Sequence, residues 1–101
     1  MRDNYRESLE SVVHDLVDMT GLVQVAVRNA TTALLDADLA TAEKTISADA
    51  ELDHRHDDLE ARCFSLMARQ APVAGELRTL VAAMRMVADL ARLGDRAAHI
   101  A

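Results

Sequence analysis

Residues 5–33, YRESLESVVHDLVDMTGLVQVAVRNATTA, decide the fold because their apolar and small side chains recur in alternating steps of four and three. This heptad spacing is typical of a long helix packed in a bundle. The repeat consists of Tyr5, Leu9, Val12, Leu16, Met19, Val23, Ala26, Ala30 and Ala33. We expect Val13, Val27 and Leu34 to widen this face toward the core. The pattern predicts a helix over residues 3–35.

Two further helices follow, separated by short turns. The stretch 36–38, Asp-Ala-Asp, contains two residues that favour turns and helix N-caps, which places the first turn there. Pro72 marks the second turn, because proline is tolerated in the first turn of a helix but not inside one. The second and third helices are therefore predicted over 39–70 and 73–101. Short connections make neighbouring helices antiparallel, so residues 1–101 should form one all-α domain running up-down-up, with a spectrin-like arrangement.

An acidic stretch interrupts the second predicted helix. Its heptad face is expected to consist of Leu39, Ala42, Ile46, Asp49, Asp53, His56, Glu60, Cys63 and Met67, with Leu52, Leu59 and Leu66 beside it. Asp49, Asp53 and His56 are spaced i, i+4 and i+7, so they share one face of the helix. A buried carboxylate without a partner costs several kcal/mol. The stretch therefore requires a solvated face, a basic partner or a bound cation. Cys63 on this face is expected to be a small buried hydrophobe.

Helix register brings another carboxylate to the same height. Asp53 should lie level with Asp89 across the second turn, and Asp49 should lie within one helical turn of Asp95. Asp95 follows Ala91 by four residues, and Ala91 belongs to the apolar face of the third helix. Carboxylates of two neighbouring helices can thus converge. Oxygen-rich sites of this kind suit hard cations such as Mg, Mn or Fe.

Other interpretations of these residues stay open. Arg92 and Arg96 lie close to Asp95 in sequence and could neutralise the carboxylates with no metal. Asp53-x-x-His56 has the spacing of the Glu-x-x-His motif that di-iron bundles carry on two helices, but it occurs once here. A ferritin-like metal enzyme would thus need more ligands, for example from a dimer. A purely structural coiled-coil module would explain the heptads but not the acidic interruption.

Composition excludes several classes of function. The formal net charge is −6, and Lys44 is the only lysine, so neither nucleic acid nor an anionic membrane surface is an expected partner. Cys63 is the only cysteine, so no disulfide within the chain is possible. The polar start of the chain does not resemble a signal peptide, and no apolar run is long enough to span a bilayer. We therefore expect a cytoplasmic protein. No nucleophile–base pair or glycine-rich phosphate loop stands out, which predicts a protein that is not an enzyme.

Several motifs resemble the PhoU family. Residues 70–78, QAPVAGELR, are similar to the family signature QxPVAxDLR, and residues 86–95, MVADLARLGD, resemble its DLERIGD helix. Residues 49–53, DAELD, match its acidic DxxxD motif, and residues 30–40, ATTALLDADLA, resemble actinobacterial members most. The resemblance covers essentially the whole chain. Because PhoU proteins usually contain two tandem three-helix repeats, it implies that this chain is the first repeat, the N-terminal half of a longer protein.

The resemblance also implies a function. PhoU proteins are cytoplasmic negative regulators of phosphate uptake and of the phosphate regulon, and they take part in phosphate homeostasis and signal transduction. They are thought to be non-catalytic adaptors between the ATPase of the phosphate ABC transporter and a membrane sensor histidine kinase. The same roles, and a homo-oligomer such as a dimer, are therefore expected here.

Some PhoU proteins bind iron, zinc or other metal ions through pairs of E/DxxxD motifs, which assigns Asp49, Asp53 and Asp95 as candidate metal ligands. Ala91 stands where the family has its fourth carboxylate. Asp89 does not replace that carboxylate, because two residues correspond to about 200° around a helix. We therefore expect Fe, Zn or Mg/Mn to bind weakly, as a mononuclear site, or not at all. His56, Asp89 and Arg92 are candidates to support the site or to replace the metal.

Overall fold

The structure, a computed structural model, describes residues 2–69 and 74–100 and consists there of three long helices. They are α1 (Arg2–Asp36), α2 (Leu39–Arg69) and α3 (Ala74–Ile100). The all-α, three-helix prediction is confirmed. The predicted helix ends at 70, 73 and 101 lie outside the described residues.

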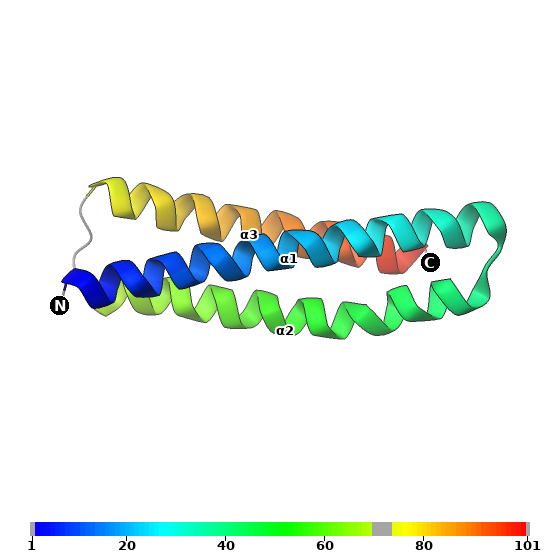
Figure 1. Ribbon diagram of the computed structural model, residues 1–101, viewed down its shortest axis with the longest axis horizontal. Coiled ribbons are helices and arrows are strands. Elements are labelled where there is room, and N and C mark those ends of the chain that lie inside the picture. The colour runs from blue at the N-terminus through cyan, green and yellow to red at the C-terminus, as the bar shows by residue number, and fades with distance from the viewer. Residues whose placement is uncertain (1, 70–73, 101) are drawn as a thin grey trace.

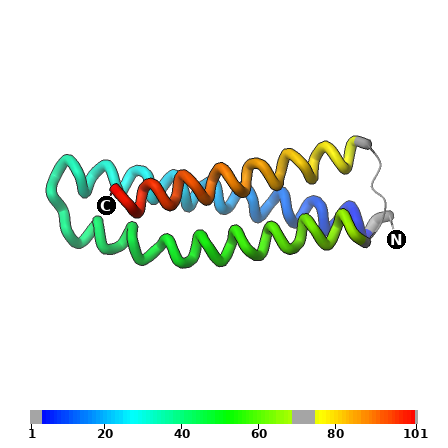
Figure 2. Tube along the Cα trace, turned by 180° about the vertical axis from the view of Figure 1, so that it is seen from behind, coloured from blue at the N-terminus to red at the C-terminus, as the bar shows by residue number. Residues whose placement is uncertain are grey.

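The helices lie side by side in a rod of 52 × 17 × 16 Å, and each packs against the other two (Figure 1). The second view shows that α3 stops short of the turn between α1 and α2 (Figure 2). No helix within the described ranges is both long enough and apolar enough to cross a membrane.

The first turn follows directly from local chemistry. Ala37 adopts a left-handed conformation with φ 51°, and the next amide, of Asp38, donates to the Ala33 carbonyl at 3.2 Å. This is the hydrogen bond of a Schellman motif, which usually has glycine at the left-handed position. Asp38 then caps α2, since its carboxylate accepts from the Thr41 amide at 3.2 Å and the Thr41 hydroxyl at 2.7 Å. Two residues between the helices, Ala37 and Asp38, thus reverse the chain.

The core is aliphatic and follows the predicted heptad of α1. Every residue of that heptad is buried except Leu9, which is partly buried and packs against the core. The expected widening of this face is wrong, because Val13, Val27 and Leu34 are 39%, 43% and 68% exposed. Because the core is formed by only three helices, α1 buries a single stripe of residues. Val13, Val27 and Leu34 lie beside that stripe and stay partly exposed.

The predicted inner face of α2 is wrong by a small rotation of the helix. Leu39 and Ile46, expected inside, are 71% and 51% exposed. Ala42 and Cys63, which were predicted on this face, are buried, and the other described buried residues of α2 are Thr45, Leu52, Leu59 and Leu66. Burying three leucines gains more than burying the acidic stripe, because apolar burial stabilises and carboxylate burial costs. The rotation moves the acidic residues to the edge of the core.

Cys63 and Thr45 show how this core accommodates polar atoms. The Cys63 side chain is 0% exposed, so its expected role as a small buried hydrophobe is confirmed. Burial raises the pKa of the Cys63 thiol and keeps it protonated. The buried Thr45 hydroxyl donates to the Thr41 carbonyl of the preceding turn at 3.0 Å, which satisfies it without a partner from another helix.

Candidate functional site: an acidic cluster between α2 and α3

Gly94 is the point of close approach between α2 and α3. A Cβ atom built on Gly94 would lie 2.8 Å from Cδ1 of Leu52 and 3.9 Å from Oδ1 of Asp49. A side chain at this position would therefore displace the end of the Leu52 side chain. The missing side chain lets α3 settle onto α2 at the height of the acidic stretch, and the next residue of α3 is Asp95.

Three carboxylates gather at this contact. Oxygen atoms of Asp49, Asp53 and Asp95 lie within 4.8 Å of one another. Asp49 is half-buried, whereas Asp53 and Asp95 are exposed. The structure thus brings together the three acidic residues that helix register had placed at one height. Their role as metal ligands remains a prediction.

Asp49 carries the electrostatic cost of the cluster. Burial raises its pKa above the ordinary range, and the charges of Asp53 and Asp95 and a hydrogen bond with Asp95 raise it further. One of its oxygens, Oδ1, is buried without a hydrogen-bond partner. Within the described ranges, no lysine or arginine forms an ion pair with any of the three. A proton or a cation would relieve this repulsion, and a cation would also satisfy the orphaned oxygen.

The three residues expected to support or replace a metal form ion pairs with other partners, and their role at the cluster remains a prediction. Asp89 and Arg92 form their own pair at 3.0 Å, three residues apart, with both side chains 69% exposed. Nδ1 of His56 lies 3.0 Å from Asp57, and its Nε2 lies 3.5 Å from Glu60, so the imidazole is occupied along its own helix. In both cases the partner lies within about one turn of the same helix.

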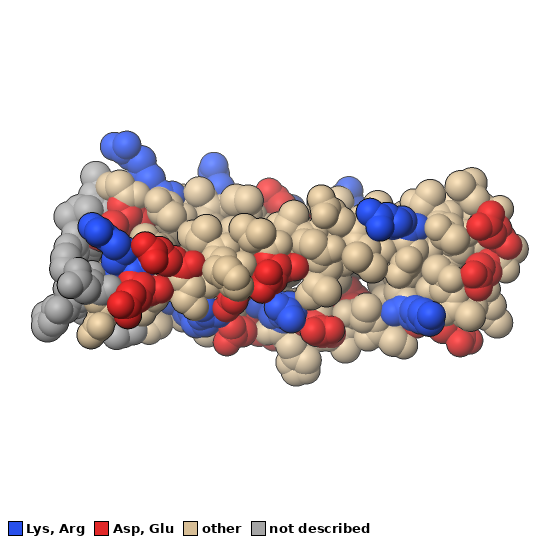
Figure 3. Space-filling view, in the orientation of Figure 1, with Lys and Arg blue, Asp and Glu red and all other residues tan. Residues whose placement is uncertain are grey.

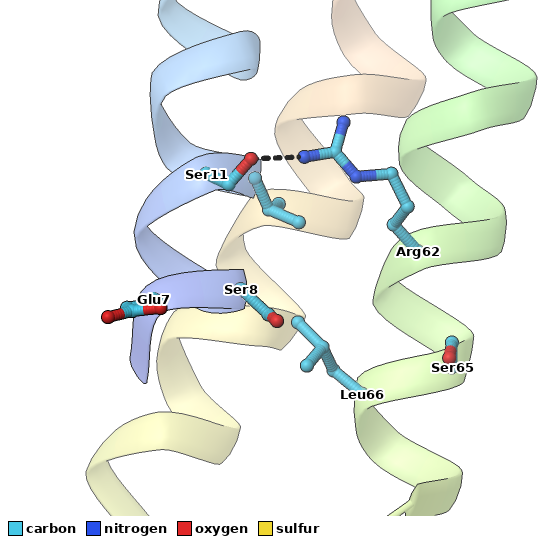
Figure 4. Close-up of a pocket in the computed structure, with 7 residues that line it drawn as sticks. Glu7, Ser8, Ser11, Arg62, Ser65 and Leu66 are labelled. Carbon is cyan, nitrogen blue, oxygen red and sulfur yellow. Dashed lines mark hydrogen bonds between the residues drawn. The ribbon is translucent and has the colours of Figure 1, made fainter. Parts of the chain in front are cut away.

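A second polar group, not found by sequence reasoning, links α1 and α2. The Arg62 guanidinium donates to Asp15 at 2.6 Å, to Asp58 at 3.0 Å and to the Ser11 hydroxyl at 2.7 Å. Figure 4 shows Arg62 reaching from α2 to Ser11 on α1. The hydrogen bond from Arg62 is the main reason that the pKa of Asp15 falls below its usual range. The only sequence signal was Arg62 four residues after Asp58, which does not identify a partner on another helix.

Arg62 also lines a hollow of about 310 Å³, together with Glu7, Ser8, Ser11, Val12, Ser65 and Leu66. The hollow contains hydroxyl groups and a guanidinium, which are groups that can bind an anion. However, Arg62 is already engaged by two carboxylates, and Glu7 adds a third negative charge. The net charge around the hollow is therefore negative, and it does not suit phosphate.

A further acidic group lies on α1, where His14, Asp15 and Asp18 offer ligand atoms within 4.8 Å of one another. The His14 side chain is 75% exposed, and the Asp15 carboxylate is held by Arg62. A cation there would compete with the guanidinium, so the cluster around Asp49 is the better candidate.

Comparison with known proteins gives consistent matches. A family model described as the PhoU domain matches residues 16–101. Over 101 residues the chain is 45% identical to "Phosphate-specific transport system accessory protein PhoU homolog 2" of Mycobacterium tuberculosis, covering 100% of this chain and 47% of that protein. It is 44% identical to homolog 1 of Mycobacterium leprae, with 100% and 46% covered.

A more distant relative is the PhoU homolog of Pseudomonas aeruginosa, which is 33% identical over 97 residues, 96% of this chain and 40% of that protein. The chain thus spans about half the length, or less, of these curated relatives. No solved structure gives a significant match.

Proposed function

Because this chain belongs to the PhoU family, we propose that it is part of a non-catalytic accessory protein that restrains phosphate uptake and phosphate-regulon signalling. The observation that carries this proposal is 45% identity along the entire chain to a relative named as an accessory protein of a phosphate-specific transport system. The family match runs from residue 16, within α1, through α2 and α3, so it is not limited to one motif.

In this role the protein would be an adaptor that binds the ATPase of the phosphate transporter and a sensor histidine kinase. The proposal is supported by large apolar side chains that are exposed on the bundle, among them Val17, Leu35, Phe64 and Met86. Exposed apolar side chains of this kind commonly mark protein–protein contacts when they form patches.

The regulatory proposal is tested by complementation. The full-length gene would be expressed in a bacterium that lacks its own PhoU protein, and a phosphate-regulon reporter would be measured in high phosphate. We expect repression to be restored. The purified protein should also retain the transporter ATPase in a pull-down. A reporter that stays fully active at normal protein levels, together with no retention of the ATPase, would contradict the proposal.

We further propose that Asp49, Asp53 and Asp95 bind one divalent cation such as Fe, Zn, Mg or Mn. Support comes from the orphaned oxygen of Asp49 and from three oxygen ligands, a donor set suited to hard cations. The cation would connect α2 to α3 and neutralise their mutual repulsion. With three carboxylates from one chain and no histidine among them, the described residues favour this role over that of a ferritin-like enzyme.

Metal content tests this second proposal. Purified protein would be compared with an Asp49→Ala/Asp53→Ala variant, and with Asp89→Asn as a control that removes a carboxylate outside the cluster. We expect bound metal in the unchanged protein and in the control, and its loss in the double variant. Equal metal in all three, or none in any, would contradict the proposal and leave protonation as the way to relieve the repulsion.

A further inference from the structure

An apolar groove runs between α1 and α3. Two adjoining hollows of about 290 and 580 Å³ form it, and both are lined by Val27 and Leu93. Figure 3 shows an uncharged area over α1 and α3 in the half of the bundle where α1 ends, with blue side chains beside it. The two hollows therefore form one surface along α1 from Thr20 to Leu35.

The two walls of the groove have the same helical spacing. On α1 the groove contains Val27, Thr31 and Leu34, and on α3 it contains Leu93, Ala97 and Ile100. Both sets follow steps of four and three residues. Since α1 and α3 run in the same direction, the walls stay in step, which is the geometry that receives another helix.

Several of these side chains are left without a partner. Val27, Leu93 and Ile100 are 43%, 47% and 55% exposed. Removing such side chains from water is the main driving force of association. The groove can therefore gain by accepting an apolar stripe.

The charge of the groove is opposite to that of the protein. The chain has a net charge of −6, yet Arg28 and Arg96 line the groove and none of its described lining residues is acidic. Neither arginine has an ion-pair partner within the described ranges. A second copy docked groove to groove would bring these arginines together, and like charges facing one another oppose association.

We propose that this groove binds an amphipathic helix whose apolar stripe is bordered by Asp and Glu, supplied by a partner protein. Leu34 and Val27 would contact the stripe, and Arg28 and Arg96 would pair with its acidic borders. A helix of about 16 residues, or about four and a half turns, matches the length of α1 that lines the groove from Thr20 to Leu35. The groove is separate from the acidic cluster, so the proposal does not depend on metal binding or on phosphate regulation.

Binding of two synthetic helical peptides tests the proposal by fluorescence anisotropy. Both carry leucine at i, i+4, i+7 and i+11, and their bordering positions are all Glu in one peptide and all Lys in the other. We expect the Glu peptide to bind the protein about tenfold more tightly, the change expected when two charge pairs at a partly desolvated rim become repulsive. An Arg28→Glu/Arg96→Glu variant should reverse this preference. The matched control, Arg6→Glu/Lys44→Glu, changes the net charge equally outside the groove and should keep it.

The outcomes separate the proposal from its alternatives. Equal binding of both peptides, or a preference that the groove variant leaves unchanged, would overturn it. Sedimentation equilibrium on the protein and on a Leu93→Gln variant identifies self-association. A dimer that only the unchanged protein forms would assign the groove to a second copy and overturn the proposal as well. If the Glu peptide did not bind, and circular dichroism showed that the protein has normal helicity, the proposal would also be overturned.

Discussion

Replacing Gly94 with alanine should destabilise the bundle, although alanine is the better helix former. The new Cβ would lie 2.8 Å from Cδ1 of Leu52, a side chain only 3% exposed. Overpacking of a filled core costs about 1–3 kcal/mol, whereas exchanging glycine for alanine inside a helix gains about 1 kcal/mol. The expected net loss is therefore about 0–2 kcal/mol.

Gly21 supplies the matched control within the same molecule. It also lies inside a helix, but a Cβ there would have no neighbour within 4 Å. Gly21→Ala should thus gain the helix propensity alone, about 1 kcal/mol. The two variants should differ by about 1–3 kcal/mol in the free energy of unfolding, which corresponds to at least about 4 °C in Tm for a domain of this size.

Urea denaturation followed by far-ultraviolet circular dichroism measures this difference. Both variants must show the helicity and the m-value of the unchanged protein, so that the comparison concerns the same folded state. If Gly94→Ala were as stabilising as Gly21→Ala, Leu52 would be free to move away. The idea that Leu52 is packed tightly against Gly94 would then be wrong. In the metal assay, a loss of binding by Gly94→Ala would show that the same contact positions Asp95.

Three further predictions concern the turn and the charged groups. Ala37→Gly should stabilise the protein by about 0.5–1 kcal/mol, measured as a higher Tm, because glycine adopts the left-handed conformation without a steric cost. Asp49→Asn should stabilise the metal-free protein at neutral pH but not at pH 3. Because the pKa of Asp49 is raised in the folded protein, the protein loses stability as pH rises from the unfolded pKa of 3.8 through the folded pKa. If the substitution changed the urea midpoint, measured with EDTA, equally at both pH values, this reasoning would be contradicted. The pH dependence due to Asp15 has the opposite sign. Because its pKa is lowered in the folded protein, Asp15 stabilises the fold above pH 3.8, and this stabilisation is lost as pH falls through the folded pKa. Arg62→Met should therefore weaken acid-dependent unfolding below that pH in urea titrations and cost about 1 kcal/mol at neutral pH.

The fold was predictable because one strong signal determined it. The heptad of α1 repeats without a break from Tyr5 to Ala33. It predicted both the helix and its buried face, and the structure confirms both. In α2 two stripes compete, one containing Leu52 and Leu59 and one containing Asp53. Periodicity alone does not weigh apolar against charged burial, so the predicted face was the wrong one of the pair.

The candidate site was predictable in part for a related reason. Asp49, Asp53 and Asp95 come together because backbone register determines their height, and register follows from helix and turn lengths. The pairing of long side chains does not follow from register. Arg92 lies within one turn of Asp95 yet binds Asp89, and Arg62 binds both Asp58 on its own helix and Asp15 on α1. These choices depend on side-chain rotamers, which periodicity does not determine.

Cys63 has a consequence for measuring how this bundle opens. Its thiol is 0% exposed and is the only one in the chain, and burial raises its pKa. A thiol-reactive dye cannot attack until α2 separates from its neighbours, so the labelling rate under native conditions counts opening events. The labelling rate of this single thiol thus reports the separation of the helices. A peptide bound in the groove, or a cation bound at the acidic cluster, would lower the labelling rate by the same factor as it favours the closed state.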